Sequence, residues 1–266
     1  MEFADYIREI DLAYSELRGE EQEARFLALG EDCRRDFGEK SGEYASLINE
    51  LGAFYRGRAE YAKAEEYFRR ALAIQESLGR AGGGDYATVV NNLAGALRLQ
   101  KRFEESELEF LRCLELYRAS VGEQHILYAG GLNNLGLLYL DLGETEKAAG
   151  VFAQASGVLE GLPDKRYEYA ASLINLGNLY LKQRQPGPAA EKLAAAVTLH
   201  ETELGTDDPH YHTALNSLGY AYEWLGEREK AAEALEKGFR AALDLYGEEH
   251  PETKALRRHL EEVKKR

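Results

Sequence analysis

Hydrophobic positions along the chain repeat with a period of about 42 residues. Five tyrosines set the register, Tyr44, Tyr86, Tyr128, Tyr169 and Tyr211, at spacings of 42, 42, 41 and 42 residues. Each is followed by a leucine, at Leu51, Leu93, Leu135, Leu176 and Leu218, and then by a small residue, at Gly52, Ala94, Gly136, Gly177 and Gly219. Large residues come three positions later, at Tyr55, Leu97, Tyr139, Tyr180 and Tyr222. Self-similarity of this kind indicates a stack of repeated structural units.

Each unit contains two helical patterns. In the first, the leucine and the large residue four positions later, such as Leu51 and Tyr55, share one helix face. In the second, small, large and small residues recur at i, i+4 and i+7: Ala64, Phe68, Ala71; Ser106, Phe110, Cys113; Ala148, Phe152, Ala155; Ala189, Leu193, Ala196; and Ala231, Leu235, Gly238. Small residues allow two helices to approach closely, and large ones fill the space between them. A short polar break separates the two helices, which predicts antiparallel helix pairs.

The pattern also predicts the boundaries of the units. Clear repeats are expected over residues 44–85, 86–127, 128–168, 169–210 and 211–252. Residues 1–43 are less regular and are expected to form a degenerate leading pair, with helices over about 3–17 and 20–37. Residues 253–266 are expected to form a capping helix, and the whole chain, 1–266, a single domain.

These columns resemble the tetratricopeptide repeat. The Leu-Gly-x-x-Tyr, alanine and phenylalanine positions match it, while the period near 42 resembles the kinesin-light-chain variety. The linkers at residues 204–209 and 246–251 resemble that variety too. The resemblance implies an all-α, right-handed superhelical solenoid of antiparallel helix pairs. It also implies that the first helices of all pairs line a concave surface.

Charge and composition exclude several classes of partner. Lys plus Arg is 33 and Asp plus Glu is 47, giving a net charge of −14. Such a balance disfavours binding to nucleic acid or to an anionic membrane. The first residues lack the pattern of a signal peptide, and no apolar run approaches the roughly 20 residues of a spanning helix. With only two cysteines, the composition favours a cytoplasmic location.

No catalytic or metal-binding constellation stands out, so we expect neither enzyme activity nor a metal or other cofactor. His210 and His212 are two positions apart and point to different helix faces, which makes them a poor metal pair. Both are interpreted as surface residues. Cys113 occupies a column that is small in the other units, so a buried packing thiol is favoured over a nucleophile.

Asparagines form a polar column just before the leucines: Asn49, Asn91, Asn92, Asn133, Asn134, Asn175 and Asn216. Asparagine is a mediocre helix former, so its recurrence calls for a reason. The resemblance implies that these positions face the concave surface and hold the backbone of a bound peptide. The alternative is that neighbouring asparagines bond across adjacent helices and hold the stack in register. Both roles are compatible.

Other groups expected on the same groove are Arg56, Arg98, Asn178, Lys182, Tyr220 and Trp224. Tyr220 and Trp224 are four residues apart and share a face, so they are either exposed anchors for a partner or core residues. Some tetratricopeptide proteins clamp a terminal carboxylate with lysine and arginine beside asparagine. The asparagine columns here carry no lysine, so that mode of binding is not expected, although Arg56 and Arg98 suit an acidic ligand.

The sequence therefore predicts a protein–protein interaction scaffold that binds a peptide segment of a partner in its concave groove. One alternative is a self-associating component of an assembly, a homo-oligomer. Another is a sensor of a small ligand or signalling peptide. The sequence does not identify the partner.

Overall fold

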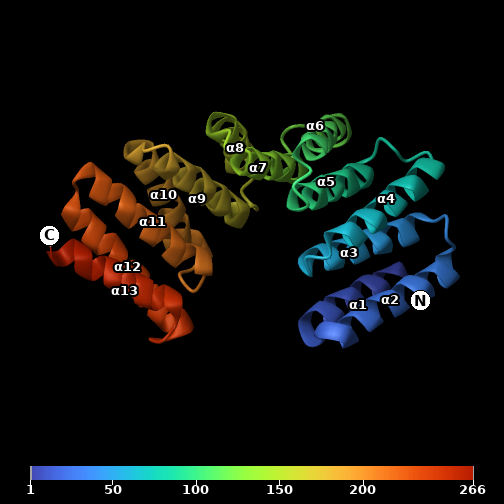
Figure 1. The fold of residues 1–266 in the computed structure, drawn as a ribbon, viewed down its shortest axis with the longest axis horizontal. Helices are drawn as coiled ribbons and strands as arrows, with labels where there is room; N and C mark the ends of the chain where they lie inside the picture. The colour runs from blue at the N-terminus through green and yellow to red at the C-terminus, as the bar shows by residue number, and fades with distance from the viewer. Residues whose placement is uncertain (1, 266) are drawn as a thin grey trace. The chain divides into compact units, whose positions relative to one another are not determined.

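The computed structural model describes residues 2–265, which are helical almost throughout. The chain divides into two compact units, one ending at Glu123 and the other beginning at Gln124. Each unit is described by itself, and the single-domain arrangement over 1–266 stays a prediction. Figure 1 shows successive antiparallel helix pairs in both. None of the described helices is long and apolar enough to cross a bilayer.

The predicted helix pairs are confirmed in both units. The N-terminal unit consists of α1 (Phe3–Glu16), α2 (Gly19–Phe37), α3 (Gly42–Gly57), α4 (Tyr61–Ser77), α5 (Gly84–Leu99) and α6 (Phe103–Ser120). The C-terminal unit consists of α7 (Ile126–Asp141), α8 (Thr145–Glu160), α9 (Arg166–Lys182), α10 (Pro186–Leu199), the π-helical turn η1 (His200–Leu204), α11 (Pro209–Leu225), α12 (Arg228–Tyr246) and α13 (Pro251–Lys265). The degenerate leading pair is α1 and α2, and the capping helix is α13.

Helices that follow one another in sequence also pack against one another within each unit. Helix α2 packs on α3 and α4 on α5, while in the C-terminal unit α10 packs on α11 and α12 on α13. The first helices of consecutive pairs are also neighbours, as α3 is to α5 and α9 to α11. The first helices therefore lie side by side and present one continuous face within each unit.

A close approach between the two helices of a pair explains the column of small residues. A Cβ atom added to Gly136 would lie 2.6 Å from Cε1 of the Phe152 ring. The same distance separates such an atom at Gly177 from Leu193 Cγ. Both large residues are fully buried. The small column therefore faces the large column of its own pair, and the predicted packing reason is confirmed.

The turns between paired helices share one backbone conformation. In each clear repeat, a residue in the left-handed region follows the first helix: Ala59, Lys101, Gly143, Arg184 and Gly226. The next residue donates its N–H to the backbone carbonyl of the large residue that lies four positions after the repeated leucine. Examples are Glu144 N to Tyr139 O at 2.8 Å and Gln185 N to Tyr180 O at 2.9 Å. This bond satisfies an end carbonyl of the first helix and fixes the direction of the second.

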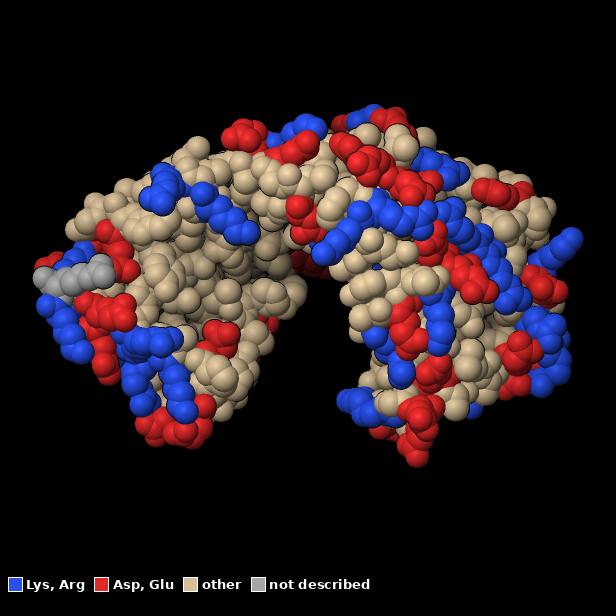
Figure 2. Space-filling view, viewed as in Figure 1, with Lys and Arg blue, Asp and Glu red and all other residues tan. Residues whose placement is uncertain are grey.

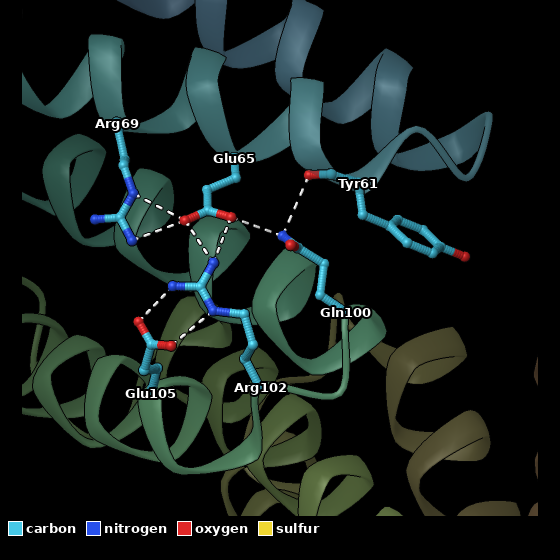
Figure 3. A network of polar contacts seen from close by, with 6 residues as sticks. All are labelled: Tyr61, Glu65, Arg69, Gln100, Arg102 and Glu105. Atoms are coloured by element: carbon cyan, nitrogen blue, oxygen red, sulfur yellow. Dashed lines mark hydrogen bonds and ion pairs between the residues drawn. The ribbon is translucent and has the colours of Figure 1, made fainter.

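A network of charged groups joins consecutive pairs in the N-terminal unit (Figure 3). The Glu65 carboxylate of α4 accepts bonds from Arg102 Nη1 at 2.7 and 2.9 Å and from Gln100 Nε2 at 2.8 Å. Arg69, one turn away on α4, donates to the same carboxylate at 2.8 Å. Burial alone would raise the pKa of Glu65, but these donors prevail and hold it below its usual value. Glu65 therefore ties α4 to the turn between α5 and α6.

One histidine assignment is wrong. His212 is only 3% exposed, and its Nε2 lies 3.3 Å from the Tyr246 hydroxyl. His210 and His212 do point to different faces of the helix, but α12 covers the face on which His212 lies. Burial lowers the pKa of His212.

The prediction for Cys113 is confirmed. Its thiol is fully buried, donates to Ala87 O at 3.4 Å, and burial raises its pKa to about 12.

The helix contact at Gly136 generates a prediction. We expect Gly136→Ala to destabilise the protein by roughly 1 to 3 kcal/mol, because the methyl group would displace the buried Phe152 ring. Gly130 is the matched control on the same helix, with no atom within 4 Å of an added Cβ. Gly130→Ala should instead stabilise by up to about 1 kcal/mol through helix propensity. Urea unfolding followed by circular dichroism measures both, and equal stability of the two variants would contradict the packing argument.

The Glu65 network predicts a pH dependence. Because its folded pKa is lowered, the stabilisation from Glu65 is present above about pH 4.5 and is lost as the pH falls through the folded value. We expect Glu65→Gln to cost roughly 1 to 2 kcal/mol at pH 7. The cost should shrink toward pH 3. Urea unfolding across this range tests it against Glu66→Gln, an exposed neighbour on α4. A pH-independent cost would show that the charge of Glu65 is not responsible.

Candidate functional site

In the N-terminal unit, the asparagine column braces neighbouring helices. Asn92 Nδ2 of α5 donates to Asn49 Oδ1 of α3 at 3.0 Å. Arg56 Nη1, also from α3, donates to Asn92 Oδ1 at 3.4 Å. Asn49 Nδ2 in turn donates to Glu50 Oε1 at 3.3 Å. Burial lowers the pKa of Arg56 and raises that of Glu50. Here the bracing alternative is observed directly, and the amides of Asn49 and Asn92 are engaged within the protein.

The same constellation returns at the end of the C-terminal unit with different residues. His259 Nδ1 of α13 lies 3.1 Å from Asn216 Oδ1 of α11, and His259 Nε2 lies 2.6 Å from Glu223 Oε2. In both networks the partners are 43 and 36 residues apart. The His259 ring therefore links Asn216 to Glu223, as the Asn92 side chain links Asn49 to Arg56.

Between helices α7 and α9 the described side chains form no such brace, that is, no side-chain hydrogen bond between the polar columns of neighbouring first helices. Asn133 of α7 precedes its leucine by two positions, as Asn49 does, and Asn175 of α9 precedes its leucine by one, as Asn92 does. Yet the Asn133 Oδ1 atom is buried and accepts no hydrogen bond, while the Asn175 side chain is exposed. Position 174 in the same column carries isoleucine, which cannot form a brace at all. Asn133 and Asn175 therefore do not form the brace that Asn49 and Asn92 form.

A cavity of about 390 Å³ lies at this interruption. Leu137 and Leu140 of α7 give it an apolar side, and Asn175, Asn178 and Lys182 of α9 give it a polar side. The sequence analysis placed these three α9 residues on one groove, and the structure brings them together on one cavity. The sequence analysis did not identify the two leucines. They could have been found because each is a large apolar residue at a repeat position where other units carry Ala53 and Gly95, or Arg56 and Arg98.

The aromatic pair at the end of α11 is exposed. Tyr220 is 43% exposed and Trp224 51%, so the alternative of core packing is wrong for both. The Tyr220 ring stacks on the His259 ring with centroids 3.9 Å apart. The remaining predicted groove residues, Asn91, Asn134 and Arg98, are half-buried on α5 and α7.

Two residues of this surface were missed by sequence reasoning. The sequence analysis singled out neither His259 nor Glu223. Both could have been found by extending the repeat register into the closing helix, because His259 occupies the position that Asn92 occupies relative to its own pair. The register was hard to extend for a physical reason. One face of the amphipathic helix α13 is exposed to solvent, so too few of the repeated apolar positions are apolar there to reveal the repeat.

The two units differ in the charge of their surfaces. Figure 2 shows Lys and Arg side chains alternating with Asp and Glu over the N-terminal unit, whereas a wide area over α9 and α11 is uncharged. Within residues 2–265, no group of three or more His, Cys, Asp or Glu residues is arranged to hold a metal ion. The arrangement provides amides, aromatic rings and apolar cavities, which are suited to non-covalent binding.

Comparison with solved structures finds the same fold in several proteins. BtubC from P. vanneervenii is 21% identical with a TM-score of 0.67, over 94% of this chain and 92% of that one. A protein of Podosopora anserina, described as a kinesin light chain with nearly identical TPR-like repeats, is 20% identical with a TM-score of 0.64, over 75% of this chain and 95% of that one. A signal transduction ATPase with a tetratricopeptide repeat sensor, from Pyrococcus horikoshii, is 18% identical with a TM-score of 0.76, over 98% of this chain and 38% of that one.

Comparison by sequence assigns the repeats themselves. No curated protein matches the chain at a significant level. Family models described as tetratricopeptide repeats match residues 45–80, 85–161, 170–210 and 213–252, which is most of the chain. Proteins built from this repeat generally serve as non-enzymatic scaffolds that bind other proteins or peptides. The register, the helix pairs and these matches agree: the chain belongs to the tetratricopeptide repeat family, and its repeats resemble those of kinesin light chains.

Proposed function

We propose that the chain binds an extended peptide segment of a partner protein, and that α7, α9 and α11 of the C-terminal unit provide the contact surface. The observation that carries the proposal is the interrupted brace. The Asn133 carbonyl is buried without a donor, and the Asn175 amide is exposed at the cavity beside it. A side-chain amide offers both a donor and an acceptor, which suits the backbone of an extended chain.

The chemistry of the cavity supports the same ligand. Leu137 and Leu140 offer apolar surface to one side chain of the segment, while Asn178 and Lys182 stand at its polar side. A cavity of about 390 Å³ with apolar walls and a few polar groups is typical of a specific binding site. Affinity would come from the burial of that side chain, and orientation from the amides.

The N-terminal unit contributes differently. Because Asn49 and Asn92 bond to each other, ligand contact on α3 and α5 falls mainly to the cationic side chains of Arg56 and Arg98. We assign these arginines to acidic groups of the same kind of segment. On α5 we assign the half-buried Asn91 to the ligand contacts of the N-terminal unit, and on α7 the half-buried Asn134 to those of the C-terminal unit, whereas Asn216 acts first as a brace for α13.

Peptide selection tests this function. Linear peptides selected on the intact protein from an unbiased displayed library should bind the wild type, and Asn175→Ala combined with Asn178→Ala should weaken them about tenfold through lost hydrogen bonds. Fluorescence polarisation of labelled peptides gives the dissociation constants.

Two matched controls accompany these variants. Thr198→Ala on α10 is exposed and lies outside the cavity, so binding should be unchanged. Lys192→Ala is the control for Lys182→Ala. Lys192 lies on α10, bonds to Glu191 and does not line the cavity, whereas Lys182 of α9 does. Selected peptides that bind the double asparagine variant as tightly as the wild type would place the ligand elsewhere, and a library that yields no binder would reject the proposal.

A further inference from the structure

A second cavity, of about 480 Å³, lies where the C-terminal unit ends. We call it the terminal cleft. Tyr220, Glu223 and Trp224 of α11 line one side, Arg228 at the start of α12 lies beside them, and α13 closes it with His259 and Glu262. Trp224 is half exposed in spite of its size. An exposed tryptophan beside a tyrosine in a concave site is typical of an anchor point for a partner.

The base of the cleft is fixed by a buried polar network. His259 is 5% exposed and is held by Asn216 on one ring nitrogen and Glu223 on the other. Glu223 stands in the network where Arg56 stands in the equivalent network of α3 and α5. The same repeat position is therefore a half-buried cation in one unit and a carboxylate in the other, and the two sites favour ligand groups of opposite charge.

The other charges of the cleft also favour a cation. Glu262 is exposed and adds a second carboxylate. Among the described residues of the lining, Arg228 is the one arginine or lysine, but its guanidinium donates to the carbonyls of Val263 and Lys264, both at 2.8 Å, and so caps α13. Lys264 and Lys265 pair with Glu236 and Glu261 instead. Helices α11 and α13 both end here with the partial negative charge of their C-termini, while α12 begins at Arg228 with the partial positive charge of its N-terminus.

We propose that the terminal cleft binds an arginine or lysine side chain of the partner segment. The cation lies over the exposed faces of Trp224 and Tyr220, since aromatic rings attract cations, while Glu223 and Glu262 neutralise its charge. The net charge of −14 favours the approach of such a basic residue. This inference rests on the proposed function, because it names the chemistry of one residue of the bound segment.

The test uses the single tryptophan of the chain as a probe. Peptides selected on the intact protein should carry arginine or lysine at one common position, and their binding should change the fluorescence of Trp224. Replacing that residue by glutamine should weaken binding on the order of tenfold. On Glu223→Gln, the same peptide change should cost less than roughly twofold, because the two changes remove one interaction.

A second pair of variants guards against misfolding of Glu223→Gln. Glu262→Gln alters an exposed rim residue, and Glu261→Gln alters its exposed neighbour on α13, which does not line the cleft. The first should reduce the preference for the basic residue and the second should leave it unchanged. Peptides that depend on Asn175 and Asn178 but show no preference for a basic residue, or show one that both glutamate variants leave intact, would overturn this inference alone. An absence of any bound peptide would overturn the proposed function with it.

Discussion

The close approach of two helix backbones within each pair is the constraint on which the rest depends. At Gly136 and Gly177 there is no room for a methyl group, because Phe152 and Leu193 fill the space on the opposite helix. This contact fixes how far apart the paired helices lie and which face of the first helix is turned away from its partner. The asparagine column lies on that remaining face. Packing therefore sets the position of the side chains on this face, but it does not restrict which polar residue stands there.

That freedom explains why one repeated scaffold carries different chemistry at equivalent positions. The pairs Asn49–Asn92 and Asn216–His259 occupy the same places in the repeat and make the same kind of contact between neighbouring helices. Arg56 and Glu223 each bond to the second member of their pair with opposite charge. Where Asn133 and Asn175 do not form the brace, Asn175 lines a cavity. Whether a residue of this column acts as a brace is therefore decided by the residue it meets on the next helix.

The closing helix has a function beyond covering the last pair. Helix α13 has an apolar side that includes Leu256, Leu260 and Val263, which are buried, and it occupies the place of a further first helix. Because it does so, His259 completes a network that would otherwise end at Asn216. The same helix forms one wall of the terminal cleft. The helix that covers the last pair therefore also forms part of the proposed site.

The sequence alone determined the helix pairs, their boundaries and the packing columns, because a period near 42 repeated five times leaves one register in which all apolar faces are buried. It also predicted one groove for five further residues, of which Asn175, Asn178 and Lys182 line one cavity and Tyr220 and Trp224 another. Only the tertiary structure decided which asparagines are braces, since that depends on the residue one repeat away. It also decided the burial of His212 and the pairing of His259 with Glu223. Such contacts join residues far apart in sequence, and local patterns carry no record of them.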